Sequence, residues 1–153
     1  MFDITKIKTA QECRNLMANA GKQNRPDVYE LAFRRLVQLE AKNQFTDEVN
    51  NDTLALQTWA AIGAVEELLR EKHGKAVKAN YTRRKLKEVG VVACLTDWAL
   101  KKDETEGFKM LVAAGLGDQT GEYVVVSNAT RFPDVVVQAA RKKLTKHNVI
   151  IKN

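Results

Sequence analysis

The chain has 153 residues, 44% of them hydrophobic, which suits one domain with a buried core and excludes a disordered chain. Two prolines and eight glycines are few for this length and favour long helices over a β architecture with many turns. No apolar run approaches the ~20 residues that cross a bilayer, and the first eight residues lack the apolar centre of a signal peptide. We therefore expect a cytoplasmic, mainly helical protein without membrane contact.

The first third of the chain contains two helical patterns. Residues 9–20 are predicted to form a helix, because Thr9 and Glu12 have the spacing of a capping box and apolar residues follow at helical intervals. Residues 26–42 form the second, because Pro26 suits a first helical turn and an apolar stripe follows it.

A third, longer helix is predicted after a polar connection at residues 43–52. It runs from Thr53 to Lys72 and is expected to be capped by Asn51 or Asp52. Apolar residues occupy most of its sides, which is typical of a helix at the centre of a fold. Gly63 within it is expected to let another helix approach closely.

Further helices are predicted over residues 80–89, 91–102 and 104–114, and a last one from Pro133 to about Lys146. Gly90 stops the first of these. The expected architecture is a single compact domain of about six helices. We find no internal repeat and no domain linker.

The region 122–127 gives the one β signal in the sequence. Tyr123–Val126 is a short, β-branched run that follows a glycine-rich turn. One strand is not stable alone, so it must pair with another segment. The alternatives are Phe2–Ile7, Val149–Ile151 or the same strand of a second copy, which would make the protein a homodimer.

The two cysteines, Cys13 and Cys94, are far apart and belong to no CxxC or Cys/His cluster. In a cytosolic protein such cysteines are expected to be reduced and buried. The two histidines, His73 and His147, are expected to be exposed. We assign no catalytic residue, no metal ligand and no cofactor.

Residues 72–87, called the basic segment below, carry the main functional signal. The segment contains no carboxylate and seven cations: Lys72, Lys75, Lys78, Arg83, Arg84, Lys85 and Lys87. Clustered positive charge repels itself, and a polyanion would relieve this repulsion. Nucleic-acid binding through phosphates is therefore the favoured function. Duplex DNA is slightly preferred, because no signature of an RNA-binding module is present.

Three uncharged residues among these cations are candidate polar contacts: Asn80, Tyr81 and Thr82. Tyr81 would stack on a base only in a single-stranded target. A helix beginning near Asn80 would add its positive N-terminal end to anion binding. A second phosphate-binding patch is expected if the last helix packs beside the basic helix, and its residues are Arg141, Lys142 and Lys146.

Several alternatives stay open from the sequence. Residues 82–99 have the size of a helix-turn-helix, but their second helix is apolar and carries Asp97, so we prefer the basic helix and its preceding loop as the contact. A winged arrangement built on the predicted strand is a weaker alternative. A small metal-dependent nuclease would use Glu67 and Glu71, which lie four residues apart beside Lys72. The last alternative is an interaction module that binds an acidic protein.

Overall fold

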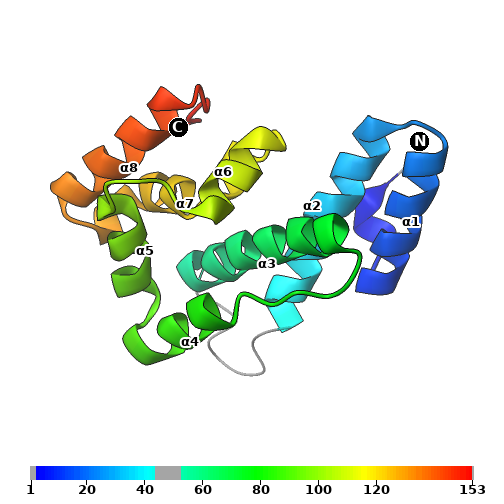
Figure 1. Ribbon diagram of the computed structural model, residues 1–153, viewed down its shortest axis with the longest axis horizontal. Coiled ribbons are helices and arrows are strands. Elements are labelled where there is room, and N and C mark those ends of the chain that lie inside the picture. Colours follow the sequence, from blue (N-terminus) through cyan, green and yellow to red (C-terminus); the bar gives the residue numbers. More distant parts are fainter. Residues whose placement is uncertain (1–2, 44–52, 153) are drawn as a thin grey trace.

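The computed structural model describes residues 3–43 and 53–152, and within these ranges it contains eight α-helices, three short 3-10 helices and no strand (Figure 1). The expected mainly helical class is confirmed. The number of helices among the described residues is higher than the six or so expected. None of the helices in the described ranges combines the length and the hydropathy that a membrane-spanning segment requires.

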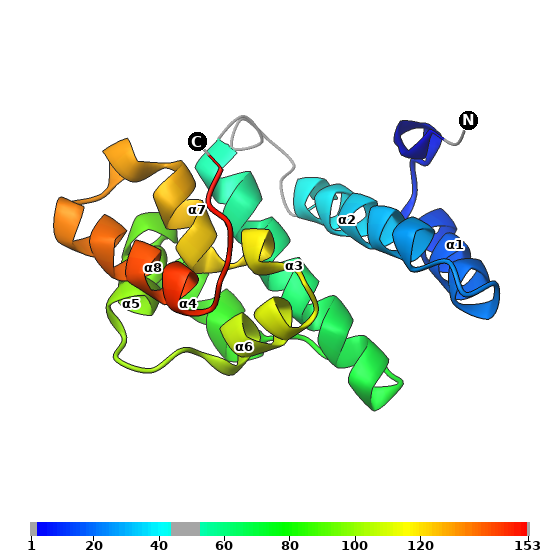
Figure 2. The ribbon, with the colours of Figure 1, turned by 90° about the horizontal axis from the view of Figure 1, so that it is seen from above.

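An antiparallel hairpin of α1 (Ala10–Lys22) and α2 (Pro26–Asn43) forms one end of the molecule (Figure 2). The 3-10 helix η1 (Ile4–Lys6) precedes it and contacts α2. Thr9 caps α1 as predicted, since its hydroxyl accepts a hydrogen bond from the Glu12 amide at 3.1 Å.

The long helix α3 (Thr53–His73) is central, as its apolar sides predicted. It contacts α2 on one side and α5, α6 and α7 on others. Its buried Thr58 stays satisfied because its hydroxyl donates to the Leu54 carbonyl at 2.8 Å. The expected caps Asn51 and Asp52 lie outside the described residues.

Four more helices of eight residues or longer follow α3 in the chain. They are α4 (Asn80–Val89), α5 (Val91–Leu100), α6 (Glu106–Ala113) and α8 (Asp134–Lys146), each close to its predicted range. Gly90 joins α4 to α5 with a φ of 88°, a backbone conformation that favours glycine. The chain therefore changes direction between the two helices with Gly90 as the single connecting residue.

The predicted strand at 122–127 is wrong: these residues form the short helix α7 (Gly121–Ser127), between the 3-10 helices η3 (Gly117–Gln119) and η4 (Ala129–Arg131). Thr120 caps α7 by accepting a hydrogen bond from the Tyr123 amide at 3.1 Å. The three valines suit this helix because α7 is buried between α5 and α8. This tertiary packing overrides their weak local preference for a strand.

The segments that the sequence suggested as pairing partners for a strand do not form strands either. Residues 4–6 form η1, and Val149–Ile151 follow α8 outside any helix or strand. Strand pairing across a dimer therefore loses its basis, because residues 122–127 already bond as a helix.

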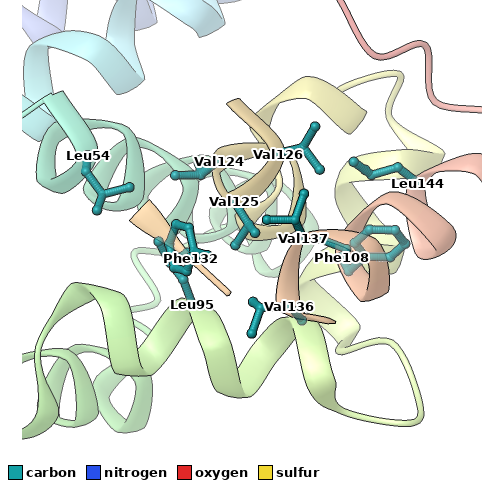
Figure 3. Close-up of a cluster of buried hydrophobic side chains, with 12 residues drawn as sticks. Leu54, Leu95, Phe108, Val124, Val125, Val126, Phe132, Val136, Val137 and Leu144 are labelled. Atoms are coloured by element: carbon teal, nitrogen blue, oxygen red, sulfur yellow. The ribbon is translucent and has the colours of Figure 1, made fainter. Parts of the chain in front are cut away.

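Two main clusters of buried side chains form the core. The larger joins α5, α7 and α8, where Leu95, Val125 and Val136 point toward one another (Figure 3). The second joins α1, α2 and α3 around Cys13 and Leu36. A third, small cluster of Ile62, Leu86 and Cys94 attaches α4 to α3 and α5. Both cysteines are buried and free, as predicted.

The expectation for Gly63 is wrong, and this gives a stability prediction. A β-carbon added at Gly63 would meet nothing within 4 Å, whereas one added at Gly121 would lie 2.6 Å from a ring carbon of Trp98. Gly63→Ala should raise the free energy of unfolding by about 0.5–1 kcal/mol, since alanine suits a helix interior better. Gly121→Ala should lower it by about 1–3 kcal/mol through overpacking. Urea unfolding of both variants measures this, and equal effects at the two sites would contradict the packing around α7.

Candidate nucleic-acid interface

The basic segment follows one edge of the molecule. From the end of α3, residues 74–79 run back toward the start of α4, which lies at the lower edge in Figure 1. Leu86 is the one residue of α4 that is fully buried. Val89, three residues further along the helix, is 49% exposed. The helix is thus peripheral, and most of its surface faces solvent.

Glu66 of α3 fixes the start of α4. Its Oε2 atom accepts hydrogen bonds from Arg83 Nε at 2.6 Å and from the Ala79 amide at 2.8 Å, and its Oε1 atom accepts from Arg83 Nη2 at 2.7 Å. The Arg83 guanidinium also lies 5.4 Å from the centre of the Trp59 ring. The hydrogen bonds with Glu66 raise the pKa of Arg83. We call this arrangement the Glu66 clamp.

Two predicted phosphate contacts, Arg83 and the N-terminal end of α4, are bound by Glu66 instead. Arg83 is engaged by a carboxylate inside the protein, with only 20% of its side chain exposed. The N-terminal end of α4 faces the same carboxylate through the Ala79 amide. An intramolecular anion therefore already occupies the position where the sequence suggested a phosphate.

Lys85 is held in a similar way by the next helix. Its Nζ atom lies 2.9 Å from an Asp97 carboxylate oxygen, and 22% of its side chain is exposed. The hydrogen bond with Asp97 raises the pKa of Lys85. Asp97 lies on α5, which buries Cys94, Leu95 and Ala99 in the core. These contacts make α5 a packing helix, which disfavours it as the recognition helix of a helix-turn-helix.

The other cations of the basic segment face solvent. Their side chains are exposed, and they form no ion pair with any residue in 3–43 or 53–152; they are Lys72, Lys75, Lys78, Arg84 and Lys87, called the five exposed cations below. The predicted polar contacts Asn80 and Tyr81 are exposed, whereas Thr82 is half-buried. Five of the seven predicted phosphate-binding cations thus remain available.

The predicted second patch lies on α8. Arg141 is half-buried, Lys142 is exposed, and Lys146 lies 3.5 Å from Glu104. The helix α8 packs on α7 and α5, and α5 also contacts α4. Because α5 lies between α8 and α4 in the view of Figure 1, the two basic regions do not form one continuous helix pair.

Lys143 belongs to the same basic run in sequence but is buried. Its Nζ atom donates a hydrogen bond to the Trp98 carbonyl at 2.7 Å and lies 3.6 Å from Glu122 Oε2. Burial raises the pKa of Glu122, and Lys143 opposes this. The helical spacing of Val136, Ala140 and Lys143 would have placed this lysine on the inward face.

The carboxylates considered for a nuclease have other contacts. Glu67 is buried and lies 3.3 Å from Arg14, which also lies 3.4 Å from Glu40. Glu71 is exposed. In the described part of the chain, no group of three or more His, Cys, Asp or Glu residues is arranged to hold a metal ion. The position of Glu67 is therefore explained by its ion pair with α1.

No family model matches the chain, and comparisons with curated proteins and with solved structures give no match either.

The clamp predicts different effects for two neighbouring arginines. Arg83→Met should lower the free energy of unfolding by about 1–3 kcal/mol, because it leaves the largely buried Glu66 without its charged partner. Arg84→Met, the control, should change it by less than about 0.5 kcal/mol, because Arg84 is exposed. Urea unfolding measures both values. Similar losses for the two variants would contradict the structural role of Arg83.

The lowered pKa of Glu104 leads us to expect that acid destabilises the fold. The hydrogen bond with His147, at 3.0 Å, and the nearby Lys146 lower the pKa of Glu104 from 4.5 to about 2. A carboxyl with a lowered folded pKa stabilises the fold above its unfolded pKa, and this contribution is lost as pH falls through the folded pKa. The contribution of Glu104 should therefore be complete above pH 4.5 and should disappear between pH 4.5 and 2.

Unfolding measured across this pH window tests the assignment. Glu104→Gln should show a shallower fall in stability than the wild type. Glu106→Gln, at a position 87% exposed, is the control and should keep the wild-type pH dependence. If Glu104→Gln and the wild type lose stability in parallel, the pairing with His147 has no thermodynamic effect.

Proposed function

We propose that the protein binds nucleic acid and that the five exposed cations contact its phosphates. The observation that carries the proposal is the contrast within the basic segment. Arg83 and Lys85 are bound by Glu66 and Asp97, whereas the other five cations face solvent without an intramolecular ion pair among the described residues. Cations of this kind neutralise phosphates and release counterions, which gives affinity without base specificity.

The position of the segment supports this proposal. The helix α4 and the loop before it lie at an edge of the molecule, so an extended polyanion can approach them without displacing another helix (Figure 1). The Glu66 clamp and the Lys85–Asp97 pair hold the helix in place. Because Arg83 and Lys85 are paired with Glu66 and Asp97, a phosphate can bind the five exposed cations without breaking the contacts that position α4.

Salt dependence of affinity tests the proposal. For five phosphate contacts, log K for random duplex DNA should fall with log salt at a slope of about −4.5. Replacing Lys75, Lys78, Arg84 and Lys87 together by alanine should reduce the slope to about −1, since one of the five cations remains. A second quadruple variant, with alanine at Lys6, Lys8, Lys22 and Lys42, removes the same charge from exposed positions elsewhere and should keep the wild-type slope.

Two results would overturn the proposal. One is equal weakening in both quadruple variants, which would mean that binding follows net charge and not the basic segment. The other is no affinity of the wild type for duplex, single strand or RNA at about 50 mM salt, where phosphate contacts are strong. The second result would favour an acidic protein as the partner.

A further inference from the structure

Among the Phe, Tyr and Trp residues that the structure describes, Tyr81 is the one whose side chain is exposed, at 73%. The other aromatic residues in these ranges are buried or half-buried, and the two tryptophans pack against the Leu86 cluster. Tyr81 contributes nothing to the core, because α4 buries only Leu86. Its ring faces water in the middle of the basic segment.

Cations lie on both sides of this ring along the chain. Lys78 lies in the loop before α4, three residues before Tyr81. Arg84 follows Tyr81 by three residues within α4, which is the spacing of neighbours on one helix face. Lys85, one residue further, lies close enough for the Tyr81 hydroxyl to affect the pKa of its ammonium. The exposed amide side chain of Asn80 is adjacent in sequence. An aromatic face, a hydrogen-bonding group and several cations are thus combined in the first half of α4 and the loop end that precedes it.

We propose that the nucleic acid bound by the basic segment is single-stranded and that Tyr81 stacks on an unpaired base while the exposed cations hold the adjacent phosphates. The inference rests on the proposed function. In a duplex the faces of the bases are covered by their neighbours, and a side chain reaches only base edges in the grooves. A single strand offers base faces, and stacking on an aromatic residue tolerates any base. The exposed ring therefore favours a single strand over the duplex that the sequence suggested.

Titrations of labelled oligothymidylate and of a random duplex of the same length, followed by fluorescence anisotropy with the full chain, test the inference. Wild-type protein should bind the single strand more tightly at the same salt concentration. Tyr81→Ala should weaken binding to the single strand by about 5- to 150-fold, the usual effect of losing one stacked base. Its duplex affinity should stay unchanged, because phosphate contacts alone support duplex binding.

Two further variants separate stacking from simple apolar contact. Tyr81→Phe keeps an aromatic face and should retain affinity for the single strand. Tyr81→Leu keeps an apolar side chain without that face and should behave like Tyr81→Ala. Because Tyr81 is exposed, all three variants should unfold at the wild-type urea midpoint, and this check separates lost stacking from lost structure.

Failure of the inference and failure of the proposed function give different results. If the wild type binds duplex at least as tightly as the single strand, and Tyr81→Ala alters neither affinity, the single-strand assignment is overturned while phosphate binding stands. If Tyr81→Leu retains full affinity, stacking is overturned. If the wild type binds neither nucleic acid, or the variant lacking Lys75, Lys78, Arg84 and Lys87 binds both normally, the proposed function itself is overturned.

Discussion

The position of α4, and with it the proposed binding surface, depends on the ion pair between Glu66 and Arg83. Three hydrogen bonds from two positions of the chain converge on one carboxylate, so the central helix α3 holds both the loop before α4 and the first turn of α4. With only Leu86 buried, α4 has little apolar contact to hold it otherwise. The basic segment therefore contains two kinds of cation. Arg83 and Lys85 form ion pairs that hold α4 in place, and the five exposed cations face solvent.

The helices could be predicted from the sequence where a capping or helix-ending residue coincides with the end of a helical pattern of apolar residues. The bounds of α4 follow from its pattern and from Gly90, and Thr9 predicts the start of α1. The helix at 121–127 could not be predicted in this way, because Val124–Val126 favour a strand locally and only packing against α5 and α8 decides between the two. The role of Gly63 also depended on neighbours that the sequence does not place.

The candidate site was predictable as a segment but not as individual contacts. Arg83 and Arg84 are adjacent and chemically identical, yet a rotation of about 100° along a helix turns one toward Glu66 and the other toward solvent. The position of Arg83 three residues before the inward-facing Leu86 was a usable signal for this difference. The identity of its partner was not, because the pairing of residues 17 apart depends on the path of the intervening loop.

NMR mapping of backbone amide chemical shifts during titration with oligothymidylate locates the contact surface residue by residue. The largest shifts should fall in residues 72–87, while the amides of the α1–α2 hairpin stay unchanged. Saturable shifts centred on that hairpin, or no shifts in residues 72–87 at saturation, would contradict binding through the basic segment.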